Sequence, residues 1–177
     1  GNGNFVKDLK TGKVQKMTQD GKRNKIINGT TDWVYEEEFA ITKAYGWSPD
    51  SKYLAFLKFD EREVPEFQMA MYGQLYPDQY TYKYPKAGEQ NSKVTLHLLS
   101  IANGKSQQIN LGTYEYIPRL NWSKTANQLV VQTMNRHQNE LNYWLIDCSG
   151  KQLVQKNIYQ EKSDNWQMLL TIVVIQT

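Results

Sequence analysis

The chain has 177 residues, a net charge of +3 and 22 % charged residues, and its basic residues are scattered along the sequence. This distribution excludes the charge pattern of a nucleic-acid-binding surface, and no apolar stretch reaches the length of a membrane span. The one cysteine, Cys148, excludes an internal disulfide. The 12 Tyr and 5 Trp residues favour strands over helices.

A repeated strand pattern begins near the N-terminus. Residues 4–17 read as two alternating strands joined by a tight turn at Gly12. The same pattern recurs over residues 95–109 and 143–156, each time around a Gly. Three copies of one pattern predict a repeat architecture.

A second repeated pattern completes the unit. Residues 46–56, with the sequence GWSPDSKYLAF, and residues 121–131, with the sequence NWSKTANQLVV, each read as a strand ending in Trp-Ser, a polar turn and an apolar strand. Joined to the first pattern, this gives four strands per repeat. The step from Gly104 to Gly150 is 46 residues, which matches one propeller blade.

These repeats predict an all-β fold, a partial β-propeller of about two and a half four-stranded antiparallel blades. Two complete blades are expected over residues 45–110 and 116–158, with half a blade before them. Because a propeller ordinarily needs about four or more blades to close, we expect residues 1–177 to be a fragment of a larger propeller domain.

Irregular spacing locates two insertions in the repeats. About 17 extra residues fall within 20–45, and about 29 fall over residues 61–89, between a strand ending near Asp60 and one starting near Lys93. We call residues 61–89 the arm. Function in scaffold folds is usually carried by such connections.

The first insertion holds the acidic and aromatic stretch DWVYEEEF, residues 32–39. Adjacent carboxylates repel one another, so the stretch is suited to binding a cation. Two neighbouring Glu can reach one ligand only from a helical turn or a tight loop, and we therefore place Glu36–Glu38 on a short helical turn. A solvated acidic loop is the alternative. A Ca²⁺ site is less favoured, because three adjacent side chains cannot supply six to eight oxygens.

The arm has alternating aromatic residues between prolines, which predicts an extended hairpin that projects from the blade. Protrusions rich in Tyr and Met are typical of contact surfaces. Packing of the arm back onto its own blade is the alternative. The candidate contact residues are Val64, Pro65, Phe67, Tyr72, Tyr80, Tyr82 and Tyr84.

Four sequence runs identify a family resemblance. DWVYEEEF, WSPDSKYLAF, EVPEF and YPKAGEQNSKVTL resemble, in order and spacing, the N-terminal propeller of the dipeptidyl peptidase IV family of prolyl oligopeptidase-like serine peptidases. The resemblance is strong from Phe5 to Leu99, is weaker to Tyr159 and is lost over the last dozen residues. The tail 166–177 is either the start of the next blade or sequence altered at a truncation. The sequences of the stretches KDLKTGK and YPKAGEQNS favour a bacterial homologue over an animal one.

The resemblance implies a function. Members of the family are homodimeric exopeptidases, periplasmic or secreted in the setting expected here, that remove a dipeptide with Pro or Ala second. Their eight-bladed propeller covers an α/β-hydrolase domain with a Ser-Asp-His triad. The resemblance places the substrate α-ammonium on Glu37 and Glu38, with Glu36, Asp32, Trp33 and Tyr35 as supporting residues. It also implies that the arm takes part in the dimer.

The catalytic parts of the family are not found in this sequence. No Gly-x-Ser-x-Gly motif occurs in it, so we expect no catalytic residue here and place the hydrolase domain outside the chain. His97 and His137 fall in strand patterns and are interpreted as structural. No cofactor or metal is expected, and the expected partners are peptides with a free N-terminus. A non-catalytic propeller scaffold that binds partners through the Tyr-rich arm is the alternative function.

Overall fold

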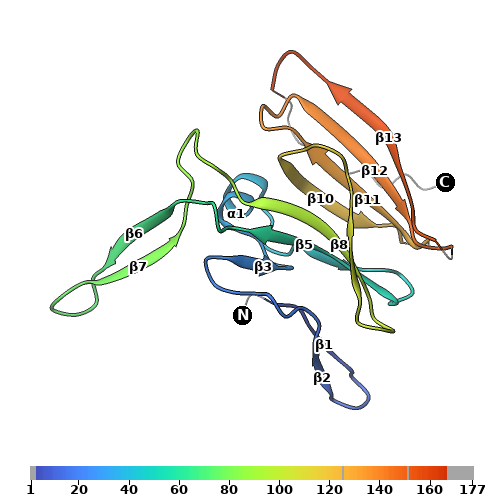
Figure 1. Cartoon of the computed structure of the whole chain (residues 1–177), viewed down its shortest axis with the longest axis horizontal. Helices are drawn as coiled ribbons and strands as arrows, with labels where there is room; N and C mark the ends of the chain where they lie inside the picture. Colours follow the sequence, from blue (N-terminus) through green and yellow to red (C-terminus); the bar gives the residue numbers. More distant parts are fainter. Residues whose placement is uncertain (1–2, 125, 151, 167–177) are drawn as a thin grey trace. The chain divides into compact units, whose positions relative to one another are not determined.

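The computed structural model describes residues 3–124, 126–150 and 152–166, and over these residues the chain forms strands and one short helix (Figure 1). The chain divides into two units. The first contains the residues up to 43 together with 58–93, and the second contains 44–57 and the chain from 94 onward. The all-β fold class predicted from the repeats is confirmed.

The second unit contains a four-stranded antiparallel sheet with the strand order β10-β11-β12-β13. The strands are β10 (Tyr116–Trp122), β11 (Gln128–Met134), β12 (Glu140–Asp147) and β13 (Val154–Lys162). Leu129 and Val131 in β11 are fully buried, as is Ile146 in β12, whereas the whole of β13 is exposed. This sheet is the complete blade predicted over residues 116–158, with its last strand four residues longer.

The other complete blade has the same order of strands. Its members are β4 (Tyr45–Trp47), β5 (Tyr53–Asp60), β8 (Lys93–Ser100) and β9 (Ser106–Ile109). β5 pairs with β4 and β8, and β8 pairs with β9. β5 ends at Asp60 and β8 begins at Lys93, where the spacing of the repeats predicted the arm to leave and rejoin the blade.

The two Trp-Ser phrases of the second unit contact each other. The indole Nε1 of Trp122 donates a hydrogen bond to the carbonyl oxygen of Gly46 at 2.9 Å, and the side-chain amide of Asn127 donates to Asp50 at 2.8 Å. A Cβ at position 46 would lie 3.1 Å from the Trp122 ring, so Gly permits this close approach. The two copies of the repeated Trp-Ser sequence are thus joined to each other by hydrogen bonds.

The two histidines differ in their surroundings. His97 in β8 stacks on Phe56 with ring centroids 5.3 Å apart, and its ring lies 3.0 Å from the Thr95 hydroxyl. His137 lies in the turn between β11 and β12, so its placement in a strand was wrong. Because a turn rich in polar residues can continue the alternating pattern of a strand, the sequence alone did not distinguish the turn that contains His137 from a strand.

The first unit begins with the predicted hairpin. β1 (Phe5–Lys7) and β2 (Val14–Lys16) pair in antiparallel fashion around a turn in which Gly12 has a φ of 72°. β3 (Ile26–Asn28), which the sequence did not predict, follows and pairs with the end of β5. The helix α1 (Trp33–Phe39) comes next.

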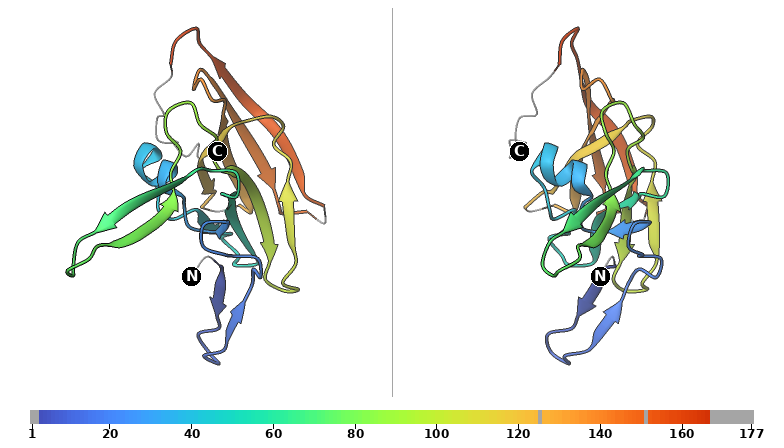
Figure 2. Two further views of the ribbon diagram at one scale, coloured as in Figure 1. Left: turned by 60° about the vertical axis from the view of Figure 1, so that its left-hand side comes forward. Right: turned by 90° about the vertical axis from the view of Figure 1, so that its left-hand side faces the viewer.

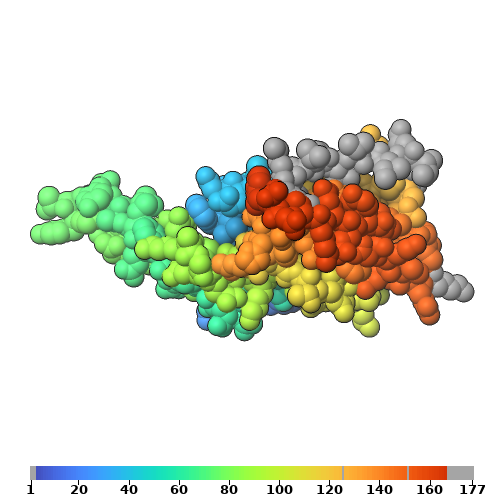
Figure 3. Space-filling view, turned by 90° about the horizontal axis from the view of Figure 1, so that it is seen from above, coloured from blue at the N-terminus to red at the C-terminus, as the bar shows by residue number. Residues whose placement is uncertain are grey.

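The arm forms the expected hairpin. β6 (Glu66–Met71) pairs with β7 (Asp78–Lys83) in register from Glu66↔Lys83 to Met71↔Asp78. It stands out from the rest of the first unit as a ribbon in Figure 2, and the space-filling view separates it (green) from α1 (blue) (Figure 3). Met71, Tyr72 and Leu75 are strongly exposed. Packing of the whole arm onto its blade is therefore not what the structure shows.

The candidate contact residues of the arm divide into three groups. Tyr72, Tyr80 and Phe67 are exposed, with exposed fractions of 83 %, 45 % and 36 %. The half-buried members are Pro65, Tyr82 and Tyr84. Val64 is only 3 % exposed, so its assignment to a contact surface was wrong. It precedes Pro65 where the arm leaves the blade, and its apolar side chain is used there for packing.

Candidate functional site

The helix α1 begins and ends with identifiable caps. Asp32 precedes it in an extended conformation, and its Oδ1 accepts a hydrogen bond from the backbone N–H of Tyr35 at 3.0 Å. Ala40 ends it in the left-handed conformation with a φ of 54°. Asp is a favoured N-cap because its carboxylate satisfies an N–H group that has no partner within the helix. The helical turn predicted for Glu36–Glu38 is confirmed and extends over seven residues.

One face of α1 is buried. Tyr35 and Phe39, four positions apart, are 2 % and 4 % exposed, and their ring centroids lie 5.0 Å apart. Tyr35 also meets Phe59 of β5 edge to face at 4.8 Å. Tyr35, predicted as a supporting residue, is a core residue that packs α1 against β5.

The opposite face of α1 carries the three Glu side chains. An α-helix turns about 100° per residue, so Glu37 lies opposite the face buried by Tyr35 and Phe39, with Glu36 and Glu38 on its two sides. All three are exposed. Among the residues that the structure describes, none of the three carboxylates has a hydrogen bond or an ion pair. Neighbouring unpaired carboxylates on a packed helix can accept several hydrogen bonds from a cationic ligand.

A buried polar network lies at the N-terminal end of α1. Asp32 is 7 % exposed, and its Oδ2 accepts a hydrogen bond of 2.5 Å from the Ser92 hydroxyl, 60 positions further along the chain. Burial raises the pKa of Asp32. Glu61, which follows β5 directly, is 6 % exposed, and burial together with the charge of Asp32 raises its pKa to about 7, against the opposing effect of Lys83.

Aromatic packing accompanies this network. The ring centroids of Trp33 and Tyr84 lie 4.3 Å apart, and Tyr84 comes directly after the arm strand β7. Trp33, predicted as a supporting residue, is thus in contact with the arm. Glu61, Ser92 and Lys83 were not predicted, because nothing in the sequence links these three single polar residues to residues 32–39.

The unfolding free energy of the chain is expected to fall as the pH rises from about 5 to about 8. Because folding raises the pKa of Glu61 from 4.5 to about 7, the folded chain binds more protons than the unfolded chain between these values, and stability is lost as the pH rises through them. We expect a loss of about 2 kcal/mol, measured by urea unfolding at both pH values. Glu61→Gln should remove this loss, and Glu63→Gln, at an exposed neighbour, should keep it. An unchanged loss in Glu61→Gln would contradict the assignment.

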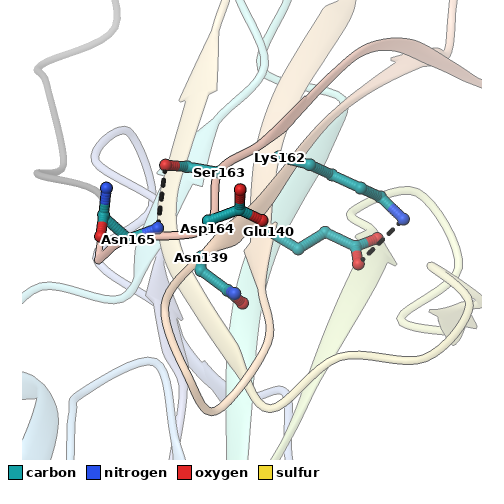
Figure 4. A pocket seen from close by; sticks show the side chains of 6 residues that line it. All are labelled: Asn139, Glu140, Lys162, Ser163, Asp164 and Asn165. Atoms are coloured by element: carbon teal, nitrogen blue, oxygen red, sulfur yellow. Dashed lines mark hydrogen bonds and ion pairs between the residues drawn. The ribbon is translucent and has the colours of Figure 1, made fainter.

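Two hollows in the surface are lined by residues other than the three Glu side chains. The larger, about 580 Å³, is in the second unit and is lined by Asn139, Glu140, Lys162, Ser163, Asp164 and Asn165 (Figure 4). Lys162 pairs with Glu140 at 3.2 Å, and the Asn165 N–H donates to the Ser163 hydroxyl. The smaller, about 390 Å³, lies at the base of the arm and includes Phe67 and Tyr84 in its lining. Neither was predicted from the sequence.

Within the described ranges, no three or more His, Cys, Asp or Glu residues are placed so that they could hold a metal ion. Among the same residues, no helix has both the length and the apolar character needed to cross a membrane. The C-terminal tail beyond Trp166 lies outside the described residues, so its predicted strand remains a prediction.

Comparison with known proteins gives consistent matches over almost the whole chain. Residues 2–176 match the family model described as "Dipeptidyl peptidase IV (DPP IV) N-terminal region". The chain is 36 % identical to dipeptidyl aminopeptidase B of Saccharomyces cerevisiae over 162 residues, which covers 86 % of this chain and 19 % of the yeast protein. It is 33 % identical to "Inactive dipeptidyl peptidase 10" of Mus musculus over 171 residues, covering 92 % and 21 %.

A solved structure gives the same result. Dipeptidyl peptidase 4 from Porphyromonas gingivalis matches with a TM-score of 0.87 and 43 % identity, over 93 % of this chain and 24 % of that one. The chain spans about a fifth of the length of the curated relatives it matches.

Proposed function

The chain belongs to the family of dipeptidyl peptidase IV N-terminal regions, and on this premise we propose that it is the substrate-recognition part of the propeller of a serine-type dipeptidyl peptidase. The full-length protein, called the parent enzyme below, removes dipeptides with Pro or Ala in second position from peptides. Its nucleophile lies in a hydrolase domain outside this chain. The observation that carries the proposal is the pair of exposed carboxylates of Glu37 and Glu38, which have no partner among the described residues, on a helix packed against the blade.

In this proposal Glu37 and Glu38 form an amine clamp that binds the α-ammonium group of the substrate. An α-ammonium group has three N–H donors, and each charge-assisted hydrogen bond to a carboxylate contributes about 1.5 to 3 kcal/mol. Holding the amino end also fixes how many residues extend from the clamp to the nucleophile. The clamp therefore makes the parent enzyme release dipeptides.

The surroundings of the clamp suit this role. The N-cap Asp32 and the buried Tyr35 and Phe39 fix the helix from its beginning and from below. Binding groups on a supported helix lose less conformational freedom when the ligand binds, which increases affinity. Glu36 takes no part in the clamp here. It lies in the first helical turn, where an acidic side chain also interacts favourably with the helix dipole.

We further propose that the parent enzyme is a homodimer, periplasmic or secreted, and that the arm contributes to the dimer interface. The exposed apolar side chains of the hairpin support this. They are Phe67, Met69, Met71, Tyr72, Leu75, Tyr76 and Tyr80. A contact surface rich in Tyr and Met buries a large apolar area while keeping polar groups at its edge.

Blocking the amino end of the ligand tests the proposal. In the parent enzyme with its nucleophile inactivated, an X-Pro peptide with a free N-terminus should bind at least tenfold more tightly than its acetylated form. The acetyl group removes the positive charge and leaves two carboxylates without a partner. Isothermal titration calorimetry measures both affinities, and a peptide with a blocked C-terminus serves as the control. Equal affinity for the free and acetylated peptides would contradict the clamp.

A second candidate function is a non-catalytic interaction scaffold. It is favoured by the similarity to a relative whose name describes it as inactive, at an identity close to that of the named aminopeptidase. The scaffold would bind partner proteins through the arm, with the three Glu side chains playing no part. It predicts a parent protein without peptidase activity, and partner binding that survives replacement of Glu37 and Glu38.

A further inference from the structure

Buried polar residues stand at the start of the clamp helix and at the two points where the chain leaves and rejoins the blade around the arm. Glu61 is the first residue after β5, and Ser92 is the last residue before β8, so they stand where the chain leaves the blade and returns to it. Asp32, the N-cap of α1, accepts a hydrogen bond of 2.5 Å from the Ser92 hydroxyl, and its charge contributes to the raised pKa of Glu61. Asp32 and Ser92 are 7 % exposed and Glu61 is 6 % exposed.

The positions of the network residues are fixed by the backbone around them. The N–H of Glu61 donates to the carbonyl of Lys25 at 2.8 Å, and its own carbonyl accepts from the Val64 N–H at 3.0 Å. Lys83 of β7 donates to the Val64 carbonyl at 2.8 Å and lies 3.5 Å from the carboxylate of Glu66. The root of the arm is therefore an ordered structure against which α1 can be held.

The clamp helix needs such support. It has only seven residues, and isolated helices of this length are unstable in water. Its first turn depends on Asp32 Oδ1, while Asp32 Oδ2 is held by the Ser92 hydroxyl. A single side chain thus starts the helix and ties it to the end of the arm. Glu37 lies five residues after Asp32, little more than one helical turn along α1.

We propose that Asp32 and Ser92 are positioning residues for the amine clamp: they hold α1 where Glu37 and Glu38 meet the substrate amino group, and the charge of the buried Glu61 modulates this hold. This inference rests on the proposed function. Misplacement of a binding group by about 1 Å can cost as much as a hundredfold in rate. The network therefore affects substrate affinity through the position of Glu37 and Glu38, without contacting the substrate itself.

The charges around Glu61 give the positioning a pH dependence. The charged groups that act on its carboxyl group are Asp32 at the start of α1 and Lys83 in β7, while the flanking Asp60 and Arg62 pair with each other. With Glu61 protonated, its carboxyl group adds no negative charge beside Asp32. As the pH rises through about 7, Glu61 becomes charged, and repulsion between Glu61 and Asp32 weakens the anchor of the helix.

Ser92→Ala in the parent enzyme is the direct test, assayed with an X-Pro p-nitroanilide substrate. This substitution leaves Asp32 in place as the N-cap but removes the hydrogen bond that the Ser92 hydroxyl donates to it. We expect KM to rise five- to twentyfold with kcat changed less than twofold, and Ser92→Thr, which keeps the hydroxyl, to restore KM. The matched control is Ser48→Ala, since Ser48 is also buried and its hydroxyl donates to Asp50 and accepts from the Tyr53 N–H, all within the second unit. This control should lose stability and keep the KM of the wild type.

Glu61→Gln provides a second measurement that does not depend on the folding of Ser92→Ala. It mimics the protonated carboxyl group, so its KM should equal that of the wild type at about pH 6. By about pH 8 the wild-type KM should be about threefold higher than that of the variant. Ionisation of the substrate amine affects both proteins equally and cancels in this ratio.

The outcomes separate this inference from the proposed function. The positioning role is overturned if Ser92→Ala keeps the wild-type KM and the ratio of the wild-type KM to the Glu61→Gln KM stays constant with pH. If Glu37→Ala impairs binding in the same series, the clamp itself stands. An equal rise in KM in Ser48→Ala also overturns it, because general destabilisation then explains the effect. If Glu37→Ala and Glu38→Ala leave KM and kcat unchanged, the clamp itself falls, and the positioning role falls with it.

Discussion

Replacing Glu37 or Glu38 with Ala in the parent enzyme is expected to lower kcat/KM for X-Pro substrates at least a hundredfold. Each carboxylate supplies one or two charge-assisted hydrogen bonds to the α-ammonium group, at about 1.5 to 3 kcal/mol each. Loss of about 2.7 kcal/mol corresponds to a hundredfold change in rate. Steady-state kinetics with a dipeptide p-nitroanilide measures the effect.

Glu36→Ala is the matched control for these two variants. Glu36 lies on the same helix and is equally exposed and unpaired, so its loss removes the same negative charge from the surface. We expect kcat/KM to change less than threefold. A small acylating probe that needs no amine recognition should label the nucleophile at the same rate in all three variants. Unchanged kinetics in both clamp variants, or an equal loss in Glu36→Ala, would contradict the assignment.

The blades and the arm could be predicted because their signals are periodic. Strand alternation and the repeated Trp-Ser phrase recur at blade length, so any insertion appears as an excess in the spacing. This is why the prediction placed the borders of the arm at Asp60 and Lys93, where β5 ends and β8 begins. The helix was predicted from the need of adjacent carboxylates to share one side, which a strand does not allow.

The short strand β3 and the buried network lacked such signals. β3 has three residues, Ile26–Asn28, and its pairing with β5 depends on a partner about thirty positions away. Asp32 and Ser92 meet across 60 positions. One clue was available: in an antiparallel four-stranded repeat, the connection before the first strand and the connection between the second and third strands lie at the same end. That rule places both insertions together and identifies their polar residues as candidates for contact.

Val64 shows where residue type alone misleads. It was assigned to a contact surface because it belongs to a segment rich in candidate contact residues, whereas Tyr35 was predicted as a supporting residue. In the structure both are buried, Val64 at the root of the arm and Tyr35 beneath the clamp helix. A segment that presents side chains to a ligand also needs side chains that hold it to the blade. In α1 these follow the helical period, since Tyr35 and Phe39 are four positions apart.

Phe59→Ala is expected to cost about 3 to 5 kcal/mol in unfolding free energy and to loosen the clamp helix. Phe59 is fully buried in β5, where it pairs with Ile27 of β3, and its ring meets Tyr35 of α1 at 4.8 Å. Removing the ring leaves a cavity beneath the helix. Urea unfolding measures the loss, and hydrogen exchange of the α1 amides measures the loosening.

Phe56→Ala separates the two effects, because Phe56 is as deeply buried in the same strand but stacks on His97 in the second unit. It should cost a similar unfolding free energy while the α1 amides keep their relative protection. Phe59→Leu, which refills much of the cavity, should cost less than about 1.5 kcal/mol. Equal loosening of α1 in Phe56→Ala would mean that the helix follows the stability of the whole chain. Specific loosening in Phe59→Ala would mean that the blade core itself holds the residues proposed to bind the substrate amine.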